Sequence, residues 1–168
     1  MKKTLCVMIM LIASVSLGYG QMKKGEDNKA ILKKFYEDVF NKHNVDAADQ
    51  FITKDGIDHN PMPGIKPGLE GIKEEFRHFF TSFPDFNVTV DDMISEGDKV
   101  VARVTVKGTN KGMMNGMAAT NKAAQWGMID IVRFKDGKAV ERWGYSDDVA
   151  MMTQLGLMPA PQGGMDKK

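Results

Sequence analysis

Cysteine is nearly absent from this sequence of 168 residues, which contains only Cys6. Cys6 lies where an apolar run near the N-terminus begins, whereas a lipid anchor would require a cysteine just after that run. We therefore expect no lipid attachment. The residues after position 20 contain no cysteine, which excludes disulfides, thiolate catalysis and cysteine-based metal sites from that part of the chain.

An excess of charge of one sign is also absent. The chain has 23 Lys and Arg residues against 22 Asp and Glu, a formal net charge of +1. Such an even balance leaves no electrostatic footprint for nucleic acid or for an acidic membrane surface, and we expect neither as a partner. A content of 42% hydrophobic and 27% charged residues is typical of a globular domain rather than a disordered chain.

Metal and cofactor motifs are lacking as well. The three histidines, His43, His59 and His78, are scattered without the spacing of metal ligands. The sequence has no glycine-rich loop for phosphates, no dinucleotide fingerprint and no Gly-x-Ser-x-Gly elbow for a serine nucleophile. We therefore expect no metal and no cofactor.

The longest apolar run is too short to span a membrane. It covers residues 5–15, whereas about 20 apolar residues are needed. Two lysines precede it and two glycines follow it, Gly18 and Gly20, an arrangement typical of a signal peptide. We expect cleavage after residue 20, export to the periplasm or the medium, and no membrane contact afterwards. The predicted divisions are a signal peptide over 1–20, a flexible lead over 21–29, one domain over 30–158 and a flexible tail over 159–168.

Hydrophobic periodicity changes halfway along the chain. Apolar residues at helical spacing predict three helices in the first half, over residues 30–43, 45–51 and 69–81. Alternation predicts four strands in the second half, over residues 86–94, 100–107, 123–134 and 138–147. Hairpin turns at 96–99 and 135–137 join neighbouring strands, and a short helix over 149–155 ends the domain. Helices followed by an antiparallel meander predict an α+β domain.

Ordered motifs in both halves resemble a known family. In the first half they are Asp58-His59-Asn60-Pro61, Gly68-x-x-Gly71-Ile72 and Phe83-Pro84-Asp85. In the second half they are Glu96-Gly97-Asp98-Lys99-Val100, Gly108-Thr109-x-x-Gly112, Met114-x-Gly116-Met117, Asp130-Ile131-x-Arg133-Phe134-x-x-Gly137-Lys138, Glu141-x-Trp143, Asp147 and Gln154-Leu155-Gly156. Over about residues 31–159, this ordered set resembles the SnoaL-like polyketide cyclase (ester cyclase) family, which is similar to the nuclear transport factor 2-like superfamily.

The resemblance implies a fold and an assembly. We expect a cone-shaped nuclear transport factor 2-like fold, in which N-terminal helices pack on a curved antiparallel sheet and enclose an apolar pocket. Members of the superfamily commonly dimerise through the open face of the sheet, so a homodimer is expected. This fold hosts enzymes and binding proteins alike, so the fold by itself does not decide the function.

The last predicted strand carries a candidate catalytic carboxylate. Alternation places Glu141, Trp143, Tyr145 and Asp147 on one face, where the two aromatic rings are expected to line a pocket wall. In ring-closing members of the family, an aspartate at the position that matches Asp147 is the general acid and base. The resemblance therefore makes Asp147 the first candidate for that role. The alternative is that Asp147 only caps the helix that begins near residue 149.

Two further residues are candidates for a supporting catalytic role. Asp130 shares a strand face with Trp126, and a charge among apolar neighbours must be paired or functional. Asp130 either pairs with Arg133 or Arg142 or acts as a second pocket carboxylate. His59 either hydrogen-bonds the substrate or Asp147, or holds the backbone of its loop.

Four more residues are predicted to line the pocket. Trp126 is expected on its wall, and Asn110 stands where the family often has a histidine. Met114 and Met117 belong to a methionine-rich loop that suits either an adaptable apolar lid or plain core packing.

The leading hypothesis is an exported domain that binds a small, mostly apolar, carbonyl-bearing molecule. It would catalyse cofactor-free acid–base chemistry, namely aldol-type cyclisation, isomerisation or a lyase reaction, through Asp147 with His59 and Asp130 assisting. The first alternative is a non-catalytic binding protein for a small ligand on the same fold. The second is a dimerising module whose pocket is filled.

Overall fold

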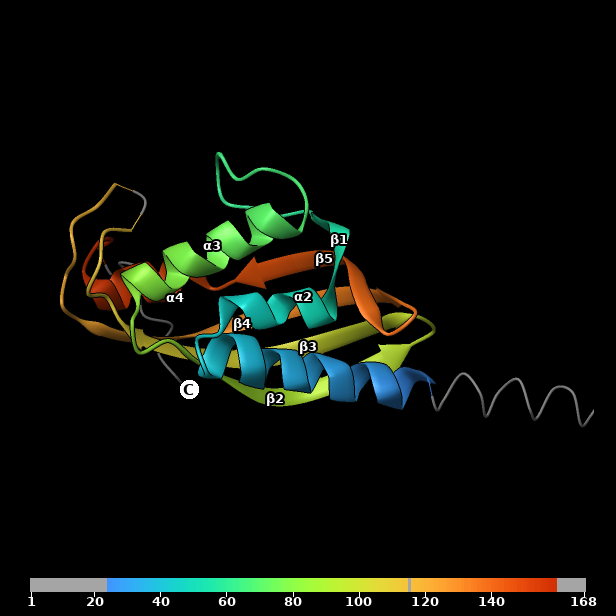
Figure 1. Ribbon diagram of the computed structural model, residues 1–168. Helices are drawn as coiled ribbons and strands as arrows, with labels where there is room; N and C mark the ends of the chain where they lie inside the picture. Colours follow the sequence, from blue (N-terminus) through green and yellow to red (C-terminus); the bar gives the residue numbers. More distant parts are fainter. Residues whose placement is uncertain (1–23, 115, 160–168) are drawn as a thin grey trace, which may run out of the picture.

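A computed structural model describes residues 24–114 and 116–159 of the chain (Figure 1). The predicted signal peptide and all but the first residue of the predicted tail lie outside the described residues. A helix over 24–35 continues as the π-helix η1 (Tyr36–Asn41), so residues 24–29 of the predicted lead are helical. The remaining elements, in chain order, are η2 (Val45–Ala47), α2 (Ala48–Phe51), β1 (Ile52–Asp58), α3 (Leu69–Ser82), β2 (Asn87–Glu96), β3 (Lys99–Thr109), β4 (Ala123–Lys135), β5 (Lys138–Ser146) and α4 (Asp148–Leu155).

The strands form one sheet in the order β1-β5-β4-β3-β2. Strands β2 to β5 are the predicted antiparallel meander, and the α+β class is confirmed. The hairpin between β4 and β5 turns at Asp136 and Gly137, both with positive φ, which is the conformation that an Asp-Gly pair favours.

Strand β1 is not predicted by the periodicity, and it makes the sheet mixed because it pairs in parallel with β5. Only two of its seven residues are buried, Ile52 and Gly56, and Gly56 has no side chain. An apolar alternation is therefore missing from its sequence. Pairing with β5 decides its conformation instead.

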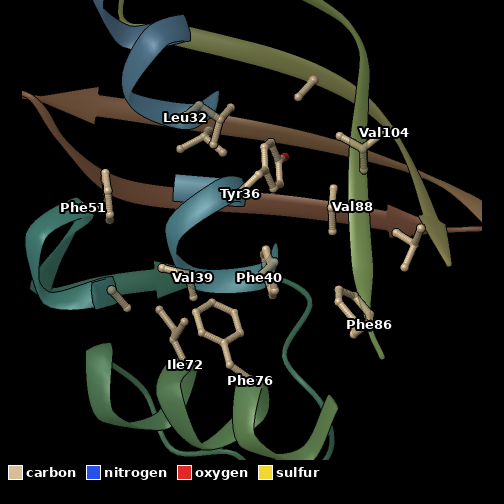
Figure 2. Close-up of a cluster of buried hydrophobic side chains, with 14 of the residues drawn as sticks. Leu32, Tyr36, Val39, Phe40, Phe51, Ile72, Phe76, Phe86, Val88 and Val104 are labelled. Atoms are coloured by element: carbon tan, nitrogen blue, oxygen red, sulfur yellow. The ribbon is translucent and has the colours of Figure 1, made fainter. Parts of the chain in front are cut away.

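The helices cover the concave face of the sheet and bury the core there. In Figure 1 the N-terminal helix, α2 and α3 lie on the same side of the sheet. Helix α4 packs against β4, where Gln154 hydrogen-bonds Gln125 near the start of the strand. Tyr36, Val39 and Phe40 of η1 meet Ile72 and Phe76 of α3 and the inner side chains of the strands (Figure 2). On β3 these inner side chains are the alternating set Val100, Ala102, Val104 and Val106, at most 1% exposed. The alternation that predicts a strand over 100–107 thus corresponds to one buried face of β3.

Truncating the centre of this core should cost stability. We expect Val104→Ala to lower the free energy of unfolding by about 2 kcal/mol, because two buried methyl groups are lost and a void remains. Urea unfolding measures the loss. Val149→Ala, at an exposed position of α4, is the matched control and should change stability by less than about 0.5 kcal/mol. Equal losses in the two variants would contradict the assignment of Val104 to the core.

Candidate functional site

A cavity of about 620 Å³ lies between the helices and the inner face of the sheet. Its volume falls within the range of small-molecule sites, and such sites have mostly apolar walls with a few polar groups. Besides aliphatic side chains, the apolar wall includes many rings and thioethers, among them Phe35, Phe40, Phe76, Phe79, Phe83, Phe86, Trp126, Met114, Met128, Met151 and Met152. The unbranched methionines let part of this wall adapt its shape.

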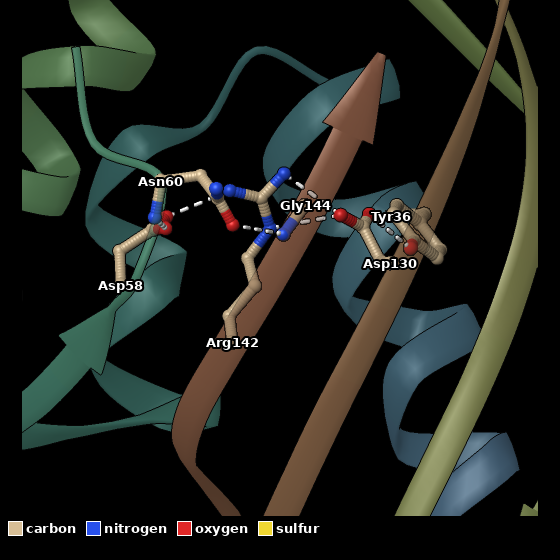
Figure 3. Close-up of polar contacts among 6 residues, drawn as sticks. All are labelled: Tyr36, Asp58, Asn60, Asp130, Arg142 and Gly144. Atoms are coloured by element: carbon tan, nitrogen blue, oxygen red, sulfur yellow. Dashed lines mark hydrogen bonds and ion pairs between the residues drawn. The ribbon is translucent and has the colours of Figure 1, made fainter.

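A chain of hydrogen-bonded charges forms the polar part of the wall (Figure 3). Arg142 donates from Nε to Asp130 Oδ1 at 2.8 Å and from Nη1 to Asp58 Oδ2 at 2.7 Å. Arg142 Nη2 also lies 2.7 Å from Asp130 Oδ1. The Tyr36 hydroxyl donates to Asp130 Oδ2 at 2.7 Å. We call these four residues the Arg142 network, and all four line the cavity.

Strand pairing brings the network together. Arg142 pairs with Val132 on β4, two residues from Asp130 on the same face, and with Asp58 on the parallel strand β1. Gly144 leaves room for the guanidinium, because a Cβ at that position would collide with the Arg142 side chain. The loop after β1 is tied to the same place, since Asn60 Oδ1 accepts a hydrogen bond from the Gly144 N–H at 3.1 Å.

Burial and charge shift the ionisation of the network. Burial raises the pKa of Tyr36 well above its usual value, and the neighbouring Asp130 carboxylate raises it further. Burial alone would lower the pKa of Arg142, but Asp130 and Asp58 outweigh that effect and raise it. Tyr36 is therefore a neutral hydrogen-bond donor and Arg142 a permanent cation.

Asp130 combines the two alternatives that its sequence left open. It pairs with Arg142, and it also lines the cavity at 3% exposure. Arg133 is on the opposite face of β4, where its Nε donates to Glu141 Oε2 at 2.6 Å. The period of two along the strand separates Arg133 from Asp130.

His59 and Trp143 lie together outside the cavity. Their rings stack at 4.6 Å, and His59 Nε2 hydrogen-bonds Glu141 Oε1 at 2.8 Å. The His59 backbone N–H donates to the Arg142 carbonyl, so this histidine also holds its loop to β5. Because Arg142 points inward, its neighbour Trp143 points outward, and Tyr145 reaches the cavity only at its mouth, 60% exposed.

Asp147 is the N-cap of α4. Its Oδ1 accepts a hydrogen bond from the Ala150 N–H at 3.0 Å, as the capping alternative expects. Its side chain is exposed and is not among the residues that line the cavity. An acid–base role for Asp147 stays a prediction from the resemblance.

The other predicted pocket residues divide into two groups. Trp126 and Met114 line the cavity. Asn110 is fully buried outside it and binds its own loop, with Oδ1 accepting from the Thr120 N–H and Nδ2 donating to the Gly112 carbonyl. Met117 packs against the core without lining the cavity.

The sequence did not single out Tyr36, Asp58, Arg142 or Glu75 as site residues, although all four line the cavity. Tyr36 belongs to the apolar stripe of its helix, Asp58 opens a loop motif, and Arg142 is on the strand face that was not expected to face inward. Glu75 had a signal, because it interrupts the apolar stripe of α3 between Ile72 and Phe79. Glu75 is 6% exposed, and burial followed by the nearby Asp58 raises its pKa, against opposing effects of Arg142 and of the Met62 N–H.

The described residues hold no group of three or more His, Cys, Asp or Glu side chains placed to bind a metal ion. Within that same part of the chain, no helix is long and apolar enough to cross a membrane.

Fold and cavity together define a class: a helix-covered curved sheet that encloses an apolar small-molecule pocket with one charged wall. The chain belongs to the SnoaL-like polyketide cyclase family, whose sequence model matches residues 30–155. This confirms the resemblance and the nuclear transport factor 2-like fold. A comparison with curated proteins found no match.

Solved structures support the same assignment. TsrD from Streptomyces laurentii is similar with a TM-score of 0.73 and 27% identity over 79% of this chain and 97% of TsrD. IdmH from Streptomyces antibioticus, provisionally described as a polyketide cyclase, has a TM-score of 0.67 and 29% identity over 77% of this chain and 98% of the IdmH chain. A Bacillus cereus protein with the same provisional description has a TM-score of 0.67 and 28% identity over 79% and 82% of the two chains.

The hydrogen bond between Tyr36 and Asp130 should couple the two residues energetically. We expect Tyr36→Phe to cost about 1.5–3 kcal/mol, since a buried bond to a charged group is lost. In an Asp130→Ala background the same change should cost at least about 1 kcal/mol less, as measured by a double-mutant cycle in urea. Tyr145→Phe is the control, because Tyr145 is 60% exposed and its hydroxyl has no hydrogen bond to another described side chain. Additive effects of Tyr36→Phe and Asp130→Ala would contradict the coupling.

Proposed function

We propose that the chain binds a small, mostly apolar, carbonyl-bearing molecule in its cavity and transfers protons to and from it without a cofactor. The observation that carries the proposal is the Arg142 network, a set of buried and half-buried charges on the wall of a mostly apolar cavity. A fixed cation beside a fixed carboxylate suits the formation of an enolate, because one group takes the proton and the other stabilises the charge that develops. Membership of the SnoaL-like polyketide cyclase family supports the same chemistry.

Asp130 has the geometry of the general base in this proposal. A carboxylate offers about four acceptor positions, and the Arg142 network uses two on Oδ1 and one on Oδ2. The remaining position on Oδ2 is available to a proton on the carbon beside the ligand's carbonyl. Asp130 takes that proton, the carbon–hydrogen electron pair forms the enolate, and Arg142 stabilises the enolate oxygen. In an aldol closure the enolate carbon attacks a second carbonyl, and Asp130 returns the proton to the new alkoxide.

Asp147 is the rival base, on the strength of the resemblance, and its exposed position at the N-cap of α4 weighs against it. The His59 ring hydrogen-bonds Glu141 outside the cavity, so His59 would assist only indirectly, by holding β5 and its Arg142 in place.

Exchange of carbon-bound hydrogen separates the two aspartates. With 1-tetralone in D₂O, we expect the protein to speed deuterium uptake beside the carbonyl, and Asp130→Asn to slow it by about 100-fold or more. Asp147→Asn should change the rate by less than about threefold, because it alters only a helix cap. NMR measures the uptake. Loss of exchange in Asp147→Asn alone would transfer the role of general base to Asp147. If neither the unchanged protein nor either variant speeds the exchange, the result would favour the non-catalytic alternative.

The non-catalytic alternative, a binding protein for a small ligand, has one observation in its favour. Both oxygens of Asp130 already hold protein donors, as in a network that only stabilises the fold. Export would favour it too, since polyketide assembly is intracellular. We keep export by the N-terminal signal as part of the proposal, on the basis of the sequence pattern described above.

A homodimer through the outer face of the sheet completes the proposal. One row of apolar side chains crosses four strands in register, from Ile94 through Val101 and Ile131 to Trp143. Beside it, Ile129 is opposite Tyr145, 44% and 60% exposed. The same face carries both signs of charge, including Arg103 with Asp91, which a second copy turned by a two-fold rotation can complement.

Native mass spectrometry of the protein purified from its own host tests the ligand, the export and the homodimer together. We expect a dimer of chains that begin at Gln21, with a small molecule released on denaturation. Ile129→Glu should shift the dimer to monomer, since it places a charge in the apolar face, whereas Val149→Glu on α4 should not. A full-length chain would contradict export, and a monomer at micromolar concentration would contradict the dimer. An empty protein would contradict a tightly held ligand and favour weak product affinity.

A further inference from the structure

Negative charge outnumbers positive charge on the wall of the cavity. Among the described residues that line it, Arg142 is the single arginine and there is no lysine. Arg142 is shared between Asp58 and Asp130, so the Arg142 network keeps a net negative charge when both carboxylates are ionised. Glu141 also touches the cavity, but Arg133 and His59 bind its carboxylate on the outer side of β5.

Glu75 adds a further carboxyl group to the lining, and no cation forms an ion pair with it among the described residues. It projects from α3 into the wall of the cavity and is 6% exposed. In the described part of the chain, no side chain forms a hydrogen bond or an ion pair with it, and a nearby backbone N–H of Met62 is its one polar contact. Burying such a group is costly unless something in the site compensates for it. Lys54 and Lys66 line a neighbouring hollow beyond Glu75, but both are exposed to solvent.

The aromatic side chains of the cavity wall favour cations as well. Phe76 and Phe79 lie within about one turn of Glu75 on α3, and Phe35, Phe86 and Trp126 continue the aromatic surface. The face of an aromatic ring attracts a cation, more strongly when water is excluded. A cavity that holds both a carboxyl group and aromatic rings therefore attracts a protonated amine and repels a carboxylate.

We propose that the cavity selects a bulky, mostly apolar amine, whose protonated nitrogen lies at Glu75 while its rings pack against the aromatic wall. This inference rests on the ligand-binding role proposed above and names the class of ligand. The amine provides an ion-pair partner for Glu75, and its carbonyl group lies toward Arg142. Anionic molecules of the same shape are rejected by the excess of carboxylates.

Three naphthalene probes of nearly equal shape test the proposal: 2-naphthylmethylamine, 2-naphthalenemethanol and 2-naphthoic acid. Isothermal titration calorimetry at pH 7 with the mature chain should show the amine binding about tenfold more tightly than the alcohol, because only the protonated amine forms a charge-assisted contact with Glu75. The acid should bind more weakly than the alcohol.

A matched pair of variants assigns the preference to Glu75. Glu75→Gln keeps the shape of the side chain and should remove most of the advantage of the amine, while binding of the alcohol changes by less than about twofold. Glu74→Gln makes the same change at an exposed position of α3 and should alter neither.

The outcomes separate the choice of an amine from the proposed function. If the alcohol binds and the amine binds no better, the amine proposal is overturned and the ligand cavity stands. The amine proposal is also overturned if Glu75→Gln leaves the advantage of the amine intact. If none of the three probes binds, both the amine proposal and the proposed ligand-binding function fail. The ranking of the three probes on the unchanged protein decides the question even if Glu75→Gln does not fold.

Discussion

The ion pairs of Arg142 are the interaction on which the rest of this structure depends. Through one guanidinium, β5 is joined to Asp130 on β4 and to Asp58 on β1, and Tyr36 extends the connection to the helix above. Buried charges are costly when they lose a partner, so the network allows little variation in how these elements sit. The edge strand β1, with few apolar residues of its own, is positioned by this contact and by its pairing with β5.

The two walls of the cavity make opposite physical demands. The charged wall is rigid because each hydrogen bond in the Arg142 network fixes both of its members. The apolar wall combines rings and aliphatic side chains with methionines, and the flexible methionines let part of it change shape. A ligand would thus be oriented by the carboxyl groups and Arg142 and accommodated by the other wall, as in small-molecule sites that combine apolar walls with a few polar groups.

Strand β5 separates the chemistry of the protein into two sides. Arg142 and Gly144 face the cavity, while Glu141 and Trp143 build an outer cluster with His59 and Arg133. Because side chains alternate along a strand, neither set can exchange roles with the other unless the register slips. The inner side lines the cavity, and the outer side anchors the loop that carries His59.

The sequence by itself determined the class of fold, the antiparallel meander and the helices, because their apolar periods are set by local geometry. It also isolated Asp130 as a charge among apolar neighbours and kept open the capping role of Asp147. Only the tertiary structure decided which face of β5 points inward, since alternation yields two faces without saying which one meets the helices. It also placed Asp58 beside Arg142, which is 84 positions away, through a strand with no pattern of its own. Sites built from such distant residues depend on pairing between elements, and that information is not contained in the spacing of any one segment.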